Sequence, residues 1–394
     1  MTDRVARDTL ATALALALGA AVSLGLARFS YALLLPPMRG ALGWTYFTAG
    51  AMGTANAAGY LAGALITPRL IAAAGARGVC LVGMFVSGAL LMGHGLAAEV
   101  GTLYALRAAS GLASAAVFVS GGLMAARLSL RDPLGAGMTP GLVLGLYYGG
   151  TGWGIVASAL IVAAPEASPA SWRDAWRWLG VVSLLAAAVM LWRSQATLTR
   201  AVASQAGLPF AARPFAFALA AYLMFGLGYI GYMTFIVTLL REQGLSTQAV
   251  SAFFALLGIG VAASPFIWAG LLQRHRDGRP LATLNALLVV ASLLPVLWPG
   301  VTAAFASAVL FGGVFLSVVA ATTALVRHNL PDSQWAAGVG AFTVVFAVGQ
   351  ILGPSAVGML ADSAGGLRAG LGASALVLLV GAGLATRQRA LAHP

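Results

Sequence analysis

The sequence predicts an all-α polytopic membrane protein with twelve transmembrane helices in two six-helix halves. Of its 394 residues, 60% are hydrophobic and only 8% are charged. The mean hydropathy is +0.92, far above that of soluble globular domains. Apolar segments of about 20 residues, long enough to cross a hydrocarbon core of roughly 30 Å, fill most of the chain. We therefore expect a protein that crosses the bilayer many times.

Charges, prolines and turn residues separate the expected spans. The first span follows Arg4 and Arg7 and is longer than the apolar region of a cleavable signal peptide, so we expect it to be retained. The twelve spans are expected near residues 11–35, 46–67, 78–97, 101–126, 139–163, 175–192, 215–240, 248–272, 280–298, 301–326, 335–360 and 367–386.

The positive-inside rule orients these spans. Every basic residue is an arginine, and the arginines outside the spans divide into fifteen on one side and five on the other. The smaller group is Arg39, Arg173, Arg177, Arg241 and Arg368. The bias predicts that both termini are cytoplasmic, and we expect a multi-pass protein of a bacterial inner membrane.

A polar segment at residues 194–213 divides the spans six and six. It is the expected cytoplasmic linker between an N-terminal half, residues 1–193, and a C-terminal half, residues 214–394. An offset of 201 positions aligns four residue pairs, Gly25 with Gly226, Tyr31 with Tyr232, Gly43 with Gly244 and Gly59 with Gly260. Two parallel repeats of this kind are typical of transporters that open a central site to each side in turn.

Several function classes find no support in the residues. One cysteine and four scattered histidines offer no metal-ligand spacing, so no metal and no cofactor are expected. All ten acidic residues lie in loops or at span ends, which leaves no catalytic constellation in the membrane, and we do not expect an enzyme. The dispersed arginines form no basic domain for nucleic acid. A membrane sensor is the non-transport alternative, but it usually carries a soluble output domain.

Arg28 and Arg107 are the two ionisable residues clearly inside the spans. A charge at that depth costs at least a few kcal/mol unless it faces water or a partner. One reading is that both contribute to a site for a carboxylate or another small anion through charge-assisted hydrogen bonds. The other is that they bind helix carbonyls, Glu99 or Asp362, or reach toward lipid phosphates.

Polar and aromatic residues on other spans complete the candidate site. Tyr31 shares a helix face with Arg28, and Tyr229 occupies the position of Arg28 at the 201-residue offset. Aromatic hydroxyls facing an arginine would make an amphipathic pocket for an organic anion. The alternative for these rings is helix packing. Further candidates for substrate binding are Tyr147, Tyr232 and Gln350.

Short motifs resemble the major facilitator superfamily. RAASGLASA at residues 107–115 is similar to its arginine-glycine motif in span 4. GALITPRLIAAAGAR at 63–77 resembles its gating loop, with Pro68 where the usual aspartate would stand, and GLLQRHRDGRP at 270–280 resembles the repeat of that loop. The resemblance implies gating roles for Arg69, Arg77, Arg276, Asp277 and Arg279.

A narrower resemblance covers most of the chain. The segments GLARFSY (25–31), LGW (42–44), NAAGYLAGAL (56–65), GLYYGG (145–150) and GQILGP (349–354) resemble the YbfB/YjiJ-type branch of the superfamily. This similarity adds Asn56 to the candidate site. It implies a major facilitator fold and a permease, without naming the cargo.

We therefore expect a secondary active transporter of a small organic anion that works by alternating access. Because arginine pairs well with carboxylates, we expect the anion to be a carboxylate. The alternative is an efflux transporter of drugs or cationic compounds, which would normally need a membrane carboxylate. The expected partners are the anionic substrate, the lipid bilayer and a proton or counter-ion, and the expected state is a monomer.

Overall fold

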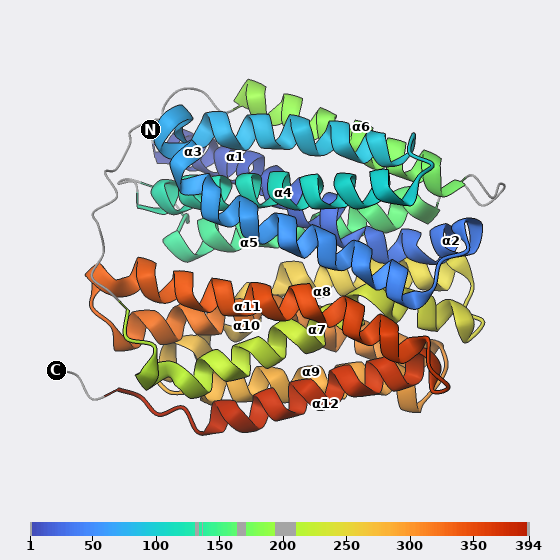
Figure 1. Ribbon diagram of the computed structural model, residues 1–394. Helices are drawn as coiled ribbons and strands as arrows, with labels where there is room; N and C mark the ends of the chain where they lie inside the picture. The colour runs from blue at the N-terminus through green and yellow to red at the C-terminus, as the bar shows by residue number, and fades with distance from the viewer. Residues whose placement is uncertain (1, 131–133, 136, 164–170, 194–209, 392–394) are drawn as a thin grey trace. The chain divides into compact units, whose positions relative to one another are not determined.

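The chain is helical throughout its described part, as its composition predicts. The computed structural model describes residues 2–130, 134–135, 137–163, 171–193 and 210–391 (Figure 1). Within these residues, eleven helices are long and apolar enough to cross a membrane. The elements are α1 (Thr2–Ala20), η1 (Ala21–Phe29), α2 (Tyr31–Leu42), α3 (Tyr46–His94), α4 (Val100–Ser129), α5 (Pro140–Ala163), α6 (Ser171–Arg193), η3 (Arg213–Phe215), α7 (Ala216–Glu242), α8 (Thr247–Arg274), α9 (Arg279–Leu297), α10 (Val301–Asn329), α11 (Asp332–Ala361) and α12 (Gly366–Thr386).

Helix α3 explains why eleven segments correspond to twelve predicted spans. Its 49 residues include Gly75, whose φ of 72° and ψ of 154° are not helical. A straight helix of that length would measure about 74 Å, more than twice the hydrocarbon thickness. A positive φ costs glycine little because it has no Cβ. The chain therefore turns at Gly75, and α3 contains two of the predicted spans, so the twelve-helix fold is confirmed.

The first span is longer than predicted. Pro36 and Pro37 were expected to end it, but both lie inside α2, which continues to Leu42. Prolines are tolerated in membrane helices because neighbouring groups satisfy the backbone atoms that they free. The chain turns instead at Gly43, where φ is 64°. Arg28 consequently lies about 21 Å before the end of the helix, at 1.5 Å per residue.

The chain divides into two compact units. Unit 1 comprises Met1–Pro37 and Ala55–Val202, and unit 2 comprises Met38–Thr54 and Ala203–Pro394. The predicted linker at 194–213 lies outside the described residues except for 210–213, and the predicted half boundaries remain a prediction. In unit 1, α1 and η1 pack against α4, α5 and α6. In unit 2, α7 packs against α11 and α12, and α10 packs against α8 and α9.

Glycines bring the helices of each unit into backbone contact, and the repeat-related pairs do so in matching ways. In unit 1, a Cβ on Gly59 of α3 would lie 1.9 Å from the Ala108 carbonyl oxygen of α4. In unit 2, a Cβ on Gly260 of α8 would lie 2.8 Å from the Gly313 nitrogen of α10. Such contacts let membrane helices pack closely by van der Waals attraction.

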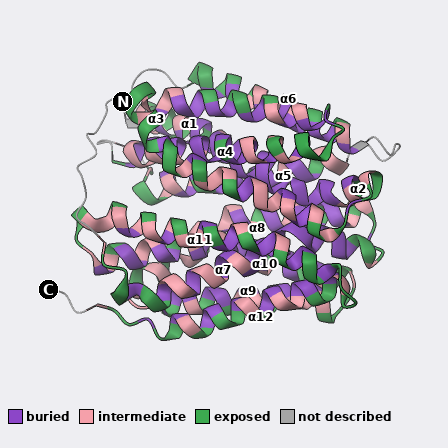
Figure 2. Cartoon of the chain, viewed as in Figure 1, coloured by how far each residue is buried: buried purple, intermediate pink, exposed green. Residues whose placement is uncertain are grey.

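Burial follows the packing (Figure 2). Alanine, glycine and serine predominate on the packed faces of α4 and α5. Large apolar side chains such as Leu160, Trp192 and Leu376 are exposed. In a membrane helix bundle, such exposed apolar residues contact lipid rather than water.

Residues 38–54 belong to unit 2 because of a small polar cluster at the start of α3. The Asp362 carboxylate, at the end of α11, accepts hydrogen bonds from the backbone N–H groups of Tyr46 and Phe47, each at 2.8 Å. The first N–H groups of a helix have no partner within the helix, and a carboxylate there also complements the helix dipole. The Tyr46 hydroxyl donates a hydrogen bond to Glu242, and the Arg39 guanidinium lies 3.7 Å from the Tyr46 ring centroid.

Asp362→Ala should therefore destabilise the protein by about 1 kcal/mol, the usual cost of losing a helix N-cap. Thermal unfolding of the purified protein in detergent would measure the change. The matched control is Asp332→Ala, since Asp332 lies in the first turn of α11, is exposed and makes no cap hydrogen bond. Equal effects of the two substitutions would contradict a capping role for Asp362.

Candidate functional site

Arg28 lies in a short π-helical segment of the first span. η1 covers residues 21–29, and it ends with the Ser30 N–H donating to the Gly25 carbonyl at 3.2 Å, a five-residue spacing. Such widened turns are rare in proteins and occur frequently at functional sites. Residues 22–29 are all buried, Arg28 included. The local backbone therefore marks the same place as the arginine does.

The π-helical segment is held by its neighbours. A Cβ on Gly25 would lie 2.4 Å from the Gly154 Cα, so η1 and α5 touch backbone to backbone. The Ser114 hydroxyl of α4 donates to the Ser23 carbonyl at 2.6 Å. The carbonyls of a widened turn need outside donors, and Ser114 supplies one.

The Arg28 side chain is stacked against aromatic rings. It is 7% exposed, and its guanidinium lies 5.0 Å from the Tyr60 ring centroid and 6.0 Å from that of Phe29. Cation–π contacts of this kind contribute about 0.5–2 kcal/mol. Among the described residues Arg28 forms no salt bridge. Its charge is thus held in place but not neutralised.

Arg107 lies beside it, from α4. It is 3% exposed, and its Nη1 donates to the Ala27 carbonyl at 3.1 Å. Its guanidinium lies 4.6 Å from the Tyr31 ring centroid. The Nε atom is buried without a hydrogen-bond partner. The two guanidiniums repel each other electrostatically, so the site carries a concentrated positive charge with hydrogen-bonding capacity to spare.

Asn56 connects α3 to this cluster. Its Nδ2 donates to the backbone carbonyl of Arg107 at 3.1 Å, and its side chain is 1% exposed. The structure therefore brings together four of the predicted residues in unit 1: Arg28, Tyr31, Asn56 and Arg107. The carbonyl contact of Arg107 is the structural role weighed for it from the sequence, and its Nε is left without a hydrogen-bond partner.

Tyr147 does not join this cluster. Its hydroxyl donates to the Phe118 carbonyl of α4 at 2.7 Å, and its ring packs against the face of α4 at Gly121. Phe118 follows Arg107 by eleven residues, about 16 Å along the helix. The geometry gives Tyr147 a packing role, because only a glycine at 121 leaves space for its ring.

Three further candidates, Tyr229, Tyr232 and Gln350, lie in unit 2. The Gln350 side-chain amide donates to the Tyr229 hydroxyl. Tyr229 is stacked on Phe225 and Phe346, with ring centroids 4.6 Å and 5.6 Å away. Tyr232 shares a hydrogen bond with the Ser307 hydroxyl. Tyr229 and Phe225 of α7 and Phe346 of α11 form an aromatic column, which is neutral where unit 1 is cationic.

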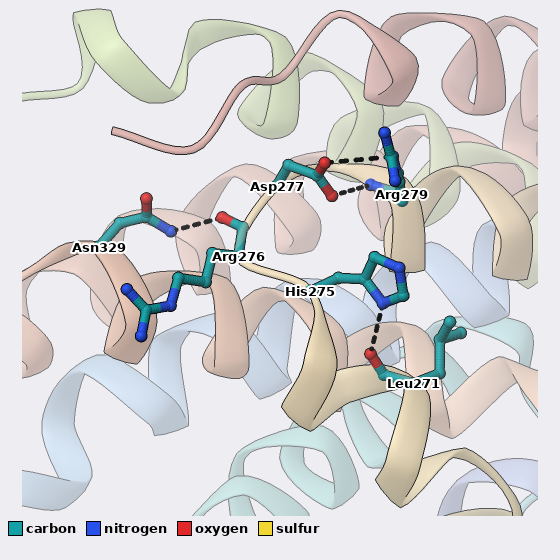
Figure 3. A network of polar contacts seen from close by, with 6 residues as sticks. All are labelled: Leu271, His275, Arg276, Asp277, Arg279 and Asn329. Atoms are coloured by element: carbon teal, nitrogen blue, oxygen red, sulfur yellow. Dashed lines mark hydrogen bonds and ion pairs between the residues drawn. The ribbon is translucent and has the colours of Figure 1, made fainter. Parts of the chain in front are cut away.

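The predicted gating residues lie at helix ends. Arg69 and Arg77 lie on either side of the turn at Gly75, and Arg69 is exposed. In unit 2, Asp277 accepts from the Arg279 backbone N–H at 3.1 Å and pairs with its side chain at 3.3 Å (Figure 3). The Arg276 carbonyl accepts from Asn329 at 2.8 Å, while the Arg276 guanidinium points away from Asp277 (Figure 3). These contacts fix the loop between α8 and α9.

Two residues near the cationic cluster were missed from the sequence. Tyr60 follows Asn56 by one helical turn, so the spacing could have placed it on the same face. His94, at the end of α3, is fully buried and stacked on Trp176 with ring centroids 4.5 Å apart. Its Nδ1 lies 2.7 Å from the Leu90 carbonyl, and its Nε2 has no partner. A search for metal spacing alone could not identify it.

The cluster is suited to binding an anion rather than to metal or covalent chemistry. Among the described residues no group of three or more histidine, cysteine or carboxylate side chains could hold a metal ion. The guanidiniums offer donors, the rings of Tyr31 and Tyr60 offer apolar walls, and no described carboxylate competes for the charge. Charge-assisted bonds to a carboxylate would satisfy the remaining donors.

Solved structures share this fold. A bacterial homologue of the human lysosomal transporter Spinster, in an inward-facing and occupied conformation, is 14% identical and matches with a TM-score of 0.74 over 96% of this chain and 95% of its own. The nucleoside transporter NupG is 13% identical and matches with a TM-score of 0.67 over 96% of this chain and 96% of its own. At such identities the likeness concerns the fold alone. No curated protein matches the chain by sequence.

The helix bundle defines a polytopic membrane protein. A family model described as "Uncharacterised MFS-type transporter YbfB" matches residues 20–386. The chain belongs to that family of the major facilitator superfamily, which confirms the resemblance seen in its motifs.

Gly154→Ala should displace the π-helical segment, because a Cβ there would lie 2.3 Å from the Ala21 carbonyl oxygen. We expect a loss of stability of about 1–3 kcal/mol, typical of overpacking, measured by thermal unfolding in detergent. Gly141→Ala on the same helix is the control, since nothing lies within 4 Å of its Cβ position. If both variants unfold like the wild type, the close contact between α1, η1 and α5 is not what holds the segment.

Proposed function

We propose that the protein is a secondary active transporter of a small organic anion, a carboxylate, working by alternating access. The observation that carries this proposal is the pair of buried guanidiniums, Arg28 and Arg107, without a carboxylate partner among the described residues. Two charges of one sign inside a bundle cost several kcal/mol unless a counter-charge or water joins them. A substrate carboxylate supplies that counter-charge while bound and removes it when it leaves.

The setting of the proposal is a bacterial inner membrane with both termini in the cytoplasm and the protein as a monomer. The arginine bias of the loops supports this orientation. Opening on the cytoplasmic side would be governed by the loops that resemble the superfamily's gating motif. Their candidate residues are Arg69, Arg77, Arg276, Asp277 and Arg279.

A second candidate, efflux of cationic compounds, draws on the aromatic column of unit 2. Tyr229, Phe225 and Phe346 present π-systems of the kind that bind organic cations. However, these rings already stack on one another in nearly parallel pairs, with interplanar angles of 17° or less. Their faces are occupied, whereas the guanidinium Nε of Arg107 is not. The cationic cluster therefore outweighs the aromatic column.

A thermal-shift screen of the purified protein tests this choice, because a ligand of the folded state raises its stability. The probes are benzoate, lactate and succinate against tetraphenylphosphonium and ethidium. Stabilisation by a carboxylate alone supports the proposal, and stabilisation by the cations alone would overturn it. Uptake of the stabilising anion into proteoliposomes would then establish transport.

Arg28→Ala should lower the affinity for such a carboxylate about ten-fold or more, because a hydrogen bond to a charged group contributes roughly 1.5–3 kcal/mol. The melting temperature of the unliganded protein should hardly change, since Arg28 makes no salt bridge to lose among the described residues. Arg368→Ala, at an exposed arginine of unit 2, is the control. Arg107→Lys should impair binding less than Arg107→Ala. Carboxylate binding that survives Arg28→Ala unchanged would remove Arg28 from the site.

A further inference from the structure

Unit 1 carries a second concave feature, away from the arginine cluster. A groove of about 400 Å³ lies between α1, α5 and α6. Its floor is the face of α1 and the start of η1 from Ala11 to Ala21, and its walls include Trp153 of α5 and Val189 of α6. Arg193, the last residue of α6, is the one charged residue among the described residues of the lining.

The sequence explains the groove. A Cβ on Gly150 would lie 2.2 Å from the Ala17 carbonyl oxygen, so α5 approaches the backbone of α1 directly. The floor of α1 presents mainly alanines, whose side chains are too short to fill the space between α5 and α6. Leu14, Trp153 and Val189 are 49%, 61% and 46% exposed, so the groove opens on the outer surface of unit 1.

The length of the groove corresponds to one leaflet. From Ala11 to Ala21 the chain advances by ten residues, which rise about 15 Å at 1.5 Å per residue, half of a hydrocarbon core of roughly 30 Å. Ala11 and Arg193 both line the groove, and α1 begins on the side of Arg4 and Arg7. The proposed orientation puts that side in the cytoplasm, where acidic phospholipid headgroups attract basic residues.

Arg193 is available for a headgroup. It is exposed, its guanidinium lies 5.3 Å from the Trp192 ring centroid, and it forms no ion pair with the residues that the structure describes. Trp192 is 75% exposed, as expected for an indole at the headgroup level. A single cation thus lies at one end of an otherwise apolar groove.

We propose that this groove binds an anionic phospholipid of the cytoplasmic leaflet, with its phosphate on Arg193 and one acyl chain along α1. The commitment to a phospholipid follows from the pairing of a guanidinium, which suits phosphate geometry, with apolar walls one acyl chain long. A soluble anion would leave the walls uncovered, and a zwitterionic lipid would gain less from the cation. The inference does not depend on what the protein transports.

Native mass spectrometry of the full-length protein tests the site, with dioleoylphosphatidylglycerol and dioleoylphosphatidylcholine mixed at equal amounts in the detergent. The wild type should retain the glycerol lipid about five-fold more, because one arginine near the headgroups contributes about 1 kcal/mol. Arg193→Gln should remove this preference, and Ala11→Phe, which fills the groove, should lower the retention of both lipids. Arg389→Gln, at an exposed arginine of unit 2, is the control and should retain the wild-type preference.

Three results would overturn the proposal. The first is a wild-type preference that survives in Arg193→Gln. The second is lipid retention unaffected by Ala11→Phe in protein that melts at the wild-type temperature. The third is equal thermal stabilisation by inorganic phosphate or by oleate, which would reduce the feature to an anion site or a fatty-acid site.

Discussion

The burial of two guanidiniums in one helix bundle is the constraint on which the structure of unit 1 depends. Arg28 and Arg107 are almost inaccessible, and no described carboxylate offsets their charge. The protein stabilises them instead with what neutral helices can supply, namely the Ala27 carbonyl and the faces of Tyr31 and Tyr60. Carbonyl dipoles and ring quadrupoles attract a cation without neutralising it. The site therefore keeps an unmet attraction for an anion, which a salt bridge would have removed.

This arrangement is possible because small residues carry the packing elsewhere. Gly25 and Gly154 let η1 and α5 meet backbone to backbone, and Gly59 does the same for α3 and α4. With the helices this close, the π-helical turn of η1 is enclosed on several sides, and the Ser114 hydroxyl satisfies one of its carbonyls. The same close approach leaves α1 lined with alanines on its outer face. The groove beside Arg193 is thus a by-product of the packing that supports the arginines.

The sequence predicted the class of fold well because hydropathy and arginine bias are averages over many residues. It also grouped Arg28, Tyr31, Asn56 and Arg107, from polarity inside apolar runs and from motif likeness, and the structure places them close together. Their role in binding stays a prediction. It could not foresee the π-helical turn at 21–29, since no local residue pattern separates five-residue from four-residue hydrogen bonding. Tyr147 was a candidate as a polar residue of the glycine-rich fifth span, but its placement depends on the gap at Gly121 of another helix. Pro36 suggested a helix end because the sequence does not show which neighbouring helices satisfy the backbone groups that a proline frees.

The two units use related frames with opposite chemistry at the related position. Gly43 and Gly244 both have positive φ, and Gly59 and Gly260 both hold a helix against its neighbour. Yet the position of Arg28 is taken in unit 2 by Tyr229, whose hydroxyl is satisfied by Gln350 and whose ring is covered by Phe225 and Phe346. A repeat of arginines would have doubled a charge that is already uncompensated. The cation lies in one unit and a neutral aromatic column in the other. The demand for a counter-charge is thereby confined to a single small site, which is the condition for a ligand, rather than the protein, to complete it.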